Sequence, residues 1–284
     1  MNIYILQLLN GLGNGMIYFL IAIGLSVVFG IMHFLNIAHG VLYLLGAYLC
    51  YAIVDATGSC WLALIVAPAA IAALVWFAHP ALRRLQALSI NFQILSTLGI
   101  ALIVQELVVL YWGEIGKHVA TPSALQGAVQ MGIIAYPKYR LFVIGVAGAL
   151  ALVLWVLLEK TRFGAVLRAG TESQDMTSLL GIDVQIVFAF TFALGAWLAA
   201  VAGVLAAPIR GVEPFMGNEA LMIAFVVVVI GGIGSFSGAL VAALLIGVVQ
   251  SLMTALWSSG ANIMIYVAMT AVILLMPRGL MGRA

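Results

Sequence analysis

The chain has 284 residues, of which 65% are hydrophobic and only 7% are charged, and its formal net charge at pH 7 is +2. Soluble domains carry roughly a quarter of charged residues, and eleven basic and nine acidic side chains cannot cover the surface of a water-soluble protein of this length. The composition therefore excludes a soluble protein, and the small net charge with scattered bases excludes a nucleic-acid partner.

Apolar segments of membrane-spanning length follow one another along the chain. A helix needs about 20 apolar residues to cross the hydrocarbon core. The N-terminal stretch lacks the basic start and the cleavage pattern of a signal peptide, so we expect the first segment to be retained. The prediction is an all-α, polytopic transmembrane helix bundle of eight to ten spans, forming a single domain over residues 1–284, in which the short seventh segment is a half-helix. The nine segments cover residues 5–29, 34–54, 61–78, 92–112, 139–158, 184–206, 221–233, 239–257 and 262–276.

Basic residues are retained on the cytoplasmic side of a membrane, which orients the spans. If residues 159–183 are cytoplasmic, seven basic residues lie inside and four lie outside. With nine spans, the N-terminus is then expected outside and the C-terminus inside. The basic residues expected inside are Arg83, Arg84, Lys160, Arg162, Arg168, Arg278 and Arg283, and those expected outside are Lys117, Lys138, Arg140 and Arg210.

Glycine is frequent inside the apolar segments as well as between them. The 30 glycines include GLGNG at 11–15, the pair Gly145 and Gly148, and GGIGSFSG at 231–238. Glycine lets helix backbones approach closely or lets a helix break where it lines a cavity, and interrupted segments in both halves are typical of transporters. FLNIAHGVLYLLGAYL and GGIGSFSGALVAALLIG both have a polar, glycine-bearing entry followed by an apolar helix, which suggests an inverted repeat. The glycines singled out in the second of these are Gly231, Gly232, Gly234 and Gly238.

Glu106 is the only acidic residue well inside a predicted span. A carboxylate in a membrane is costly and is a functional-site hypothesis by default, here a residue of the transport pathway. The alternatives are a structural acceptor for a neighbouring helix, a protonated acid, or a position at the outer interface. His39, with Asn36 and Gly40 in one motif, is a second candidate for the pathway or its gate, although a lone membrane histidine more often makes a helix-packing hydrogen bond. Ser96 is a further pathway candidate.

Other polar residues within the spans are expected to bond helices to one another. Cys50 and Cys60 have no CxxC spacing and are interpreted as small hydrophobic residues. The sequence has no nucleophile elbow, paired carboxylate set, histidine metal motif or phosphate loop, so we expect no enzyme, no bound metal or cofactor, and no ATP site on this chain. The candidates for interhelical bonds are Asn10, Asn14, Ser96, Thr97, Gln105, Gln250, Thr254 and Asn262.

Residues 159–183 are too polar to cross a bilayer and must lie at a surface. Within them, Thr171 can cap a helix whose residue Gln174 reaches back to it in a capping box. Glu172 and Asp175 would then fall in the first turn, where negative charge is favoured by the helix dipole.

This short helix is predicted to be amphipathic. Met176, Leu179 and Leu180 recur at helical spacing and form an apolar stripe, and Gly181 can end the helix in the left-handed conformation. The stripe could rest on the protein's own membrane face or enter a groove on a partner, and the sequence leaves both alternatives open.

Four stretches of the sequence resemble the permease subunits of the branched-chain amino acid ABC importer family. RAGTESQDMTSLLGIDV, which contains Arg168, Gly181 and Ile182, resembles the cytoplasmic coupling segment of that family. LNIAHGVLYLLGAY resembles its N-x-A-H-G motif, GGIGSFSGALVAALLIG its glycine-rich segment, and PRGLMG its C-terminal tail. The resemblance extends in order over essentially the whole chain.

The resemblance implies a multi-pass permease subunit in a bacterial or archaeal inner membrane that imports branched-chain or related hydrophobic amino acids. It also implies a second homologous permease subunit, two cytoplasmic ATPases that use ATP and Mg, and a periplasmic or other extracytoplasmic binding protein. Import of urea, short amides or small carboxylates is the alternative within the family, and a channel or secondary carrier acting alone is the alternative outside it. The residues expected to contact an ATPase are Arg168, Thr171, Glu172, Asp175, Met176, Leu179, Leu180 and Gly181.

Overall fold

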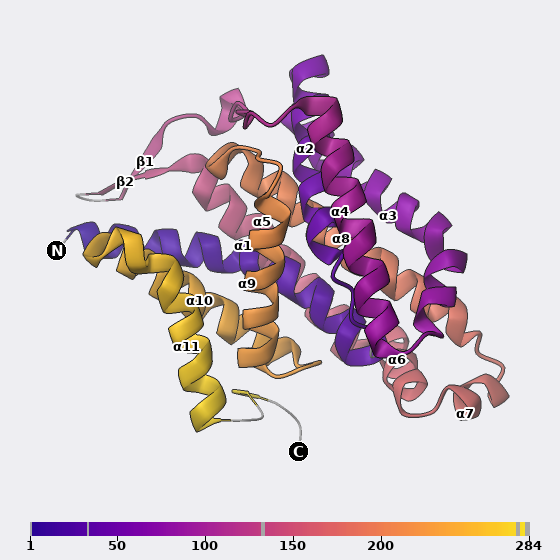
Figure 1. Cartoon of the computed structure of the whole chain (residues 1–284). Helices are drawn as coiled ribbons and strands as arrows, with labels where there is room; N and C mark the ends of the chain where they lie inside the picture. Colours follow the sequence, from indigo (N-terminus) through magenta and orange to yellow (C-terminus); the bar gives the residue numbers. More distant parts are fainter. Residues whose placement is uncertain (1, 33, 132–133, 277–278, 282–284) are drawn as a thin grey trace.

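The computed structural model describes residues 2–32, 34–131, 134–276 and 279–281, and most of them are helical (Figure 1). Eight helices in this part of the chain are long and apolar enough to cross a membrane, and a ninth apolar helix, α9, is shorter. The predicted all-α polytopic bundle and its short seventh segment are therefore confirmed. The elements are α1 (Asn2–Met32), α2 (His39–Thr57), α3 (Cys60–Gln86), α4 (Ile90–Trp112), η1 (Ser123–Leu125), β1 (Ala128–Met131), β2 (Ile134–Pro137), α5 (Lys138–Trp155), η2 (Val156–Lys160), α6 (Arg162–Glu172), α7 (Gln174–Leu179), α8 (Val184–Arg210), α9 (Met216–Gly231), α10 (Phe236–Leu256), η3 (Ser258–Gly260) and α11 (Ala261–Leu275).

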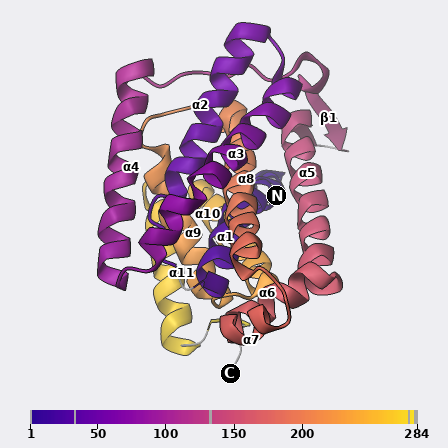
Figure 2. The same cartoon turned by 90° about the vertical axis from the view of Figure 1, so that its right-hand side faces the viewer.

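The helices α1, α2, α8, α9 and α10 form the centre of the bundle, and α4 and α5 lie at opposite edges in Figure 2. Along α8, buried residues extend from Val184 to Ala207, and the middle of α1 is buried from Gly15 to Leu20 and beyond. By contrast, α3, α4 and α11 expose large apolar side chains along their outer faces. Such faces are suited to lipid or to another membrane subunit, because apolar surface in water would be costly.

The bundle has two ends, which we name by what they carry. At the hairpin end, β1 and β2 pair antiparallel between Ala128 and Pro137, and Lys117 and Val212 form an isolated antiparallel bridge. At the α6–α7 end, the short helices α6 and α7 connect α5 to α8 (Figure 1). Residues 161–183 thus lie between two candidate spans and outside both, as the polar sequence predicts.

Close backbone contacts hold the central helices together at several glycines. A Cβ at Gly11 of α1 would lie 2.6 Å from Cα of Val248 in α10, and one at Gly46 of α2 would lie 2.6 Å from Cα of Ala200 in α8. Side chains at these positions would overlap backbone, so glycine is required for this spacing. The predicted close packing at GLGNG is thus confirmed for its first and last glycines.

The expectation that Gly145 and Gly148 bring helix backbones together is wrong within this chain. A Cβ at Gly145 would meet nothing within 4 Å, and one at Gly148 would make only an ordinary 3.8 Å contact with the side chain of Met16. These glycines lie on α5, an edge helix, so no neighbouring backbone comes near them.

The predicted interruption at GGIGSFSG is confirmed. The helix α9 ends at Gly231, and the chain turns through Gly232 and Gly234, which have φ of 96° and 76°. These are left-handed values that favour glycine. Ser235 then caps α10 by accepting a hydrogen bond from Gly238 N–H at 3.1 Å.

Two sequence predictions are not decided by these contacts. The inverted repeat stays a prediction, although residues 34–38 and 232–235 are both non-helical entries to the helices α2 and α10. The C-terminal motif PRGLMG lies partly outside the described residues. Within its described part, Leu280 N–H donates to the carbonyl of Ile230 at 2.7 Å.

Candidate functional site

The α6–α7 segment is fixed to the bundle by a distorted turn at the end of α5. Val156–Lys160 form a π-helical turn, which leaves carbonyl groups for side chains to satisfy. Arg168 Nη1 donates to the Leu158 carbonyl at 2.6 Å and lies 3.8 Å from Glu159 Oε2. Thr161 Oγ1 donates to the Leu157 carbonyl at 2.6 Å. Arg168 therefore ties α6 to the end of α5, a contact that the sequence did not predict.

The predicted cap of the short helix at Thr171 is wrong. The helix α7 starts at Gln174, and its cap is Ser173, which accepts a hydrogen bond from Met176 N–H at 3.2 Å. Thr171 is in the last turn of α6 instead, and Glu172 is the last residue of that helix rather than a residue of the first turn of α7. The side chains of Thr171 and Asp175 lie outside the described part of the structure.

The helix α6 continues past Thr171 because its apolar face packs on α1 and α8. Leu167 is 1% exposed, and a Cβ at Gly170 would lie 3.3 Å from the Val184 side chain. Burial of this face holds the backbone helical until Glu172, after which the chain turns at Ser173.

The apolar stripe of the segment is exposed. Met176 is 66%, Leu179 80% and Leu180 79% exposed. Gly181 follows with φ of 79°, as predicted for the residue that ends the helix. The stripe does not rest on the described part of this chain, and its contact with an ATPase stays a prediction.

A cavity of about 580 Å³ joins the α6–α7 end to the interruption between α9 and α10. Its lining includes Arg168 and Glu172 of α6, Ser26 and Gly30 of α1, and Gly234. Gly234 N–H donates to Ser26 Oγ at 3.2 Å. Two stretches that the sequence analysis singled out separately, RAGTESQDMTSLLGIDV and GGIGSFSG, thus lie beside the same cavity.

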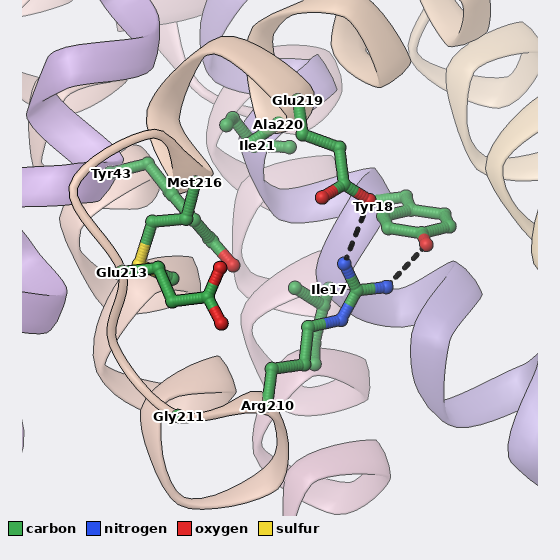
Figure 3. A pocket seen from close by; sticks show the side chains of 10 residues that line it. All are labelled: Ile17, Tyr18, Ile21, Tyr43, Arg210, Gly211, Glu213, Met216, Glu219 and Ala220. Carbon is green, nitrogen blue, oxygen red and sulfur yellow. Dashed lines mark hydrogen bonds and ion pairs between the residues drawn. The ribbon is translucent and has the colours of Figure 1, made fainter. Parts of the chain in front are cut away.

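A second cavity, of about 190 Å³, lies at the hairpin end, and we call it the Arg210 pocket (Figure 3). Arg210, the last residue of α8, donates from Nη2 to the Tyr18 hydroxyl at 2.5 Å, and its Nη1 lies 3.5 Å from Glu219 Oε1. The guanidinium carbon is 5.4 Å from the centre of the Tyr18 ring, a cation–π distance. The pocket is lined by Ile17, Tyr18, Ile21, Tyr43, Arg210, Gly211, Glu213, Met216, Glu219 and Ala220.

A chain of side-chain hydrogen bonds leads from this pocket across the bundle. Tyr18 donates to Gln250 Oε1 of α10 at 2.5 Å, and Gln250 Nε2 donates to Asn262 Oδ1 of α11 at 2.9 Å. With Arg210 and Glu219, these bonds join five helices. They confirm the predicted interhelical roles of Gln250 and Asn262.

Three other polar residues bond between segments as predicted. Gln105 Oε1 of α4 accepts from Asn218 Nδ2 of α9 at 2.9 Å, and Thr97 Oγ1 of α4 accepts from Ile37 N–H at 3.2 Å. Asn10 Oδ1 of α1 accepts from Arg140 of α5 at 2.9 Å. Thr254 instead donates within its own helix, to the Gln250 carbonyl.

The motif around His39 takes part in helix packing. His39 is 1% exposed, and its Nε2 lies 3.1 Å from the Ile21 carbonyl, which fits a neutral ring donating to that oxygen. The Asn36 carbonyl accepts from His39 N–H at 3.2 Å, and Gly40 lies against the backbone of Gly217. This agrees with the structural interpretation of the motif. A direct contact with a transported solute stays a prediction.

Ser96 and Glu106 on α4 line neither of these two cavities. Glu106 is exposed on the outer side of α4, whereas its neighbour Gln105 is buried and faces α9. Their roles in a pathway therefore stay predictions.

Sequence analysis missed the Arg210 pocket. The sequence predicts only that Arg210 is a basic residue on the outer side, and its motifs do not include Tyr18, Tyr43, Glu213 or Glu219. The available signal was local, because RGVEPFMGNE places three charged residues between two apolar segments of a chain that is only 7% charged. The tyrosines come from distant segments and carry no local sign of this role.

Comparison with known proteins gives full-length matches. A family model described as "Branched-chain amino acid transport system / permease component" matches residues 7–277. The chain is 35% identical over 301 residues to the high-affinity branched-chain amino acid transport system permease protein LivH of Escherichia coli (strain K12), covering 99% of this chain and 96% of that protein. It is 32% identical over 299 residues to the corresponding protein BraD of Pseudomonas aeruginosa, with the same coverage. No solved structure gives a significant match.

Proposed function

The chain belongs to the family of branched-chain amino acid transport permeases, and from this membership we propose that it is the membrane subunit of an ATP-driven importer of branched-chain or related hydrophobic amino acids. It is a permease subunit of an ABC-type transporter and a multi-pass protein of the inner membrane. The direction of transport, the coupling to ATP and the solute are the proposed parts.

The observation that carries the coupling proposal is the exposed stripe of Met176, Leu179 and Leu180 at the α6–α7 end. An apolar stripe on a short helix outside the spans is expected to enter a groove on a cytoplasmic partner. Because this chain has no phosphate loop, we assign ATP and Mg to two partner ATPases. A second permease subunit and an extracytoplasmic binding protein complete the proposed assembly.

The connections of α6 and α7 support transmission of movement into the bundle. Arg168 ties α6 to the Leu158 carbonyl at the end of α5. On the other side, Asp183 caps α8 by accepting hydrogen bonds from Gln185 and Ile186 N–H at 3.0 and 3.2 Å. Displacement of α7 by an ATPase would therefore be passed to α5 and α8. The far end of α8 carries Arg210, so the same helix reaches both ends of the bundle.

The test uses the complete transporter in liposomes with ATP inside and a radiolabelled branched-chain amino acid outside. Leu179→Arg places a charge in the stripe and is expected to lower uptake by about tenfold or more, because a desolvated charge in an apolar groove costs at least 1.4 kcal/mol. Asp175→Lys is expected to uncouple ATP hydrolysis from uptake. Gln174→Arg is the matched control, since it adds the same charge to the same helix outside the stripe.

Wild-type uptake by both Leu179→Arg and Asp175→Lys would overturn the coupling proposal. Uptake by this chain reconstituted alone would favour a channel or secondary carrier. Uptake of urea, short amides or small carboxylates in place of amino acids would retain the assembly and change the solute.

A further inference from the structure

We propose that the Arg210 pocket binds the solute on its way into the membrane, holding the carboxylate of an α-amino acid on Arg210 and its ammonium group on Glu213. The inference rests on the proposed function and adds a solute site within this chain. The pocket lies at the hairpin end, opposite the α6–α7 segment, which is where a solute would enter if that segment is cytoplasmic.

Arg210 is oriented for a carboxylate by the residues around it. The Tyr18 hydroxyl accepts from one terminal nitrogen, and the Tyr18 ring faces the guanidinium group. The other terminal nitrogen meets Glu219 Oε1 at 3.5 Å, the long limit of a hydrogen bond. The Glu219 side chain is 54% exposed, so this pair is weak and solvent-screened. A solute carboxylate can therefore replace Glu219 and form the two-pronged contact that arginine favours.

The same pocket supplies a site for the ammonium group. The Glu213 carboxylate lines the pocket, and among the described residues it forms no ion pair. In Figure 3 its carboxylate lies on the other side of the pocket from the Arg210–Glu219 contact, so the two charges of a zwitterion would have separate partners. Displaced Glu219 would remain beside the pocket and add negative charge near the ammonium group.

The remaining lining suits an apolar side chain. Ile17 and Ile21 of α1, together with Met216 and Ala220 of α9, complete the wall. A site with one cation, one free carboxylate and aliphatic walls fits a small zwitterion with a hydrocarbon side chain. It does not fit urea or a simple carboxylate equally well, because urea would neutralise neither charged group and a simple carboxylate only one of them.

Binding of a solute in the pocket would change contacts between several helices. Tyr18 links Arg210 to Gln250 and Asn262, and release of Glu219 would free the first turn of α9 from the end of α8. The solute would thus alter contacts among the helices that surround the pocket.

The test measures protection of a cysteine in the pocket. Met216→Cys is placed in a Cys50→Ala, Cys60→Ser background, and the complete transporter in lipid nanodiscs is treated with a membrane-impermeant thiol reagent. Leucine is expected to slow labelling by about fivefold, and the analogues 3-methylbutylamine and 4-methylpentanoate, each lacking one charged group, should need about tenfold higher concentration for the same protection. Phe215→Cys, a neighbour outside the pocket lining, is the control and should not be protected.

Two further variants test which pocket residue binds each charged group of leucine. Arg210→Gln is expected to abolish the advantage of leucine over 3-methylbutylamine, and Glu213→Gln its advantage over 4-methylpentanoate. Arg210→Lys keeps the positive charge and controls for misfolding caused by loss of the arginine. It should retain part of the protection by leucine. Equal protection by all three ligands, or protection unchanged in Arg210→Gln, would overturn the inference.

Uptake measured after the same transporter is reconstituted in liposomes separates this inference from the proposed function. A transporter that imports leucine without protecting Met216→Cys would contradict the pocket assignment alone. One that protects the cysteine but shows no ATP-driven uptake would contradict the proposed coupling and leave the pocket in place.

Discussion

The helices α8 and α4 are equally apolar, yet they occupy different places in the bundle. Both are long and apolar enough to cross a membrane, but 67% of the most apolar stretch of α8 is buried and only 22% of that of α4. The difference follows from side-chain size. The buried part of α8 includes Gly195, Ala199, Ala200 and Gly203, whereas α4 carries large apolar residues on its exposed side.

Hydropathy and position in the bundle are therefore separate properties of a membrane helix. Apolar content allows a helix to enter the bilayer, where lipid and protein are similarly apolar surroundings. Small residues on several sides then let other backbones approach, and this decides which helix becomes central. Where small residues are few, polar contacts at single positions hold the helix to its neighbours, as Gln105 and Thr97 do for α4.

The largest expected effect is that of Gly203→Val on α8. A Cβ at this position would overlap the Tyr43 carbonyl and lie 3.0 Å from the Ala47 backbone nitrogen. Neither backbone group can rotate away, so α2 and α8 must separate, and we expect a loss of about 4 kcal/mol in stability. The apparent melting temperature of the purified protein in detergent measures it.

Gly99→Val on α4 is the matched control. A Cβ at Gly99 would meet nothing within 4 Å. The same substitution should therefore change stability by less than about 0.5 kcal/mol. Comparable losses for the two variants would refute the account based on small residues.

The positions of the helices could be predicted from the sequence, because apolar content is a local property. Each of the nine predicted segments overlaps an observed helix. Helix ends were less predictable. The third segment was expected to end at residue 78, but α3 continues through Pro80 to Gln86, since the apolar run ends before the helical backbone does.

In the candidate site, too, local features could be predicted from the sequence and contacts between distant segments could not. The exposed stripe on α7 could be predicted because its spacing is visible within a few residues. The cap could not be chosen between Thr171 and Ser173, because the packing of Gly170 on Val184 extends α6. The Arg210 pocket needed Tyr18 and the residues after α8 to be brought together across the chain, which no local pattern specifies.

Gln105→Leu is expected to have an intermediate effect, by removing a polar contact between α4 and the centre. The Asn218 amide would lose its acceptor at 2.9 Å, at a cost of about 1 kcal/mol in stability. A double-mutant cycle with Asn218→Leu measures the coupling from melting temperatures. Additive losses in the two single variants would show that the hydrogen bond contributes nothing.

Thr97→Val is expected to cost slightly less, about 0.5 to 1 kcal/mol. Valine keeps the shape of the side chain but removes the acceptor for Ile37 N–H, which lies at 3.2 Å in the non-helical entry to α2. Thr97→Ser restores the acceptor and should recover most of the lost stability. Equal melting temperatures for the serine and valine variants would contradict this role.

Glu106→Gln should have the smallest effect on the stability of this chain. Glu106 is next to Gln105 in sequence but is exposed on the other side of α4, and no described base pairs with it. We therefore expect a change below about 0.5 kcal/mol in the isolated chain. A carboxylate on an outer membrane face nevertheless requires a polar neighbour, so uptake by the complete transporter should fall although melting is unchanged. Wild-type uptake would remove Glu106 from the pathway, and a melting shift as large as that of Gln105→Leu would show that α4 is held on both sides.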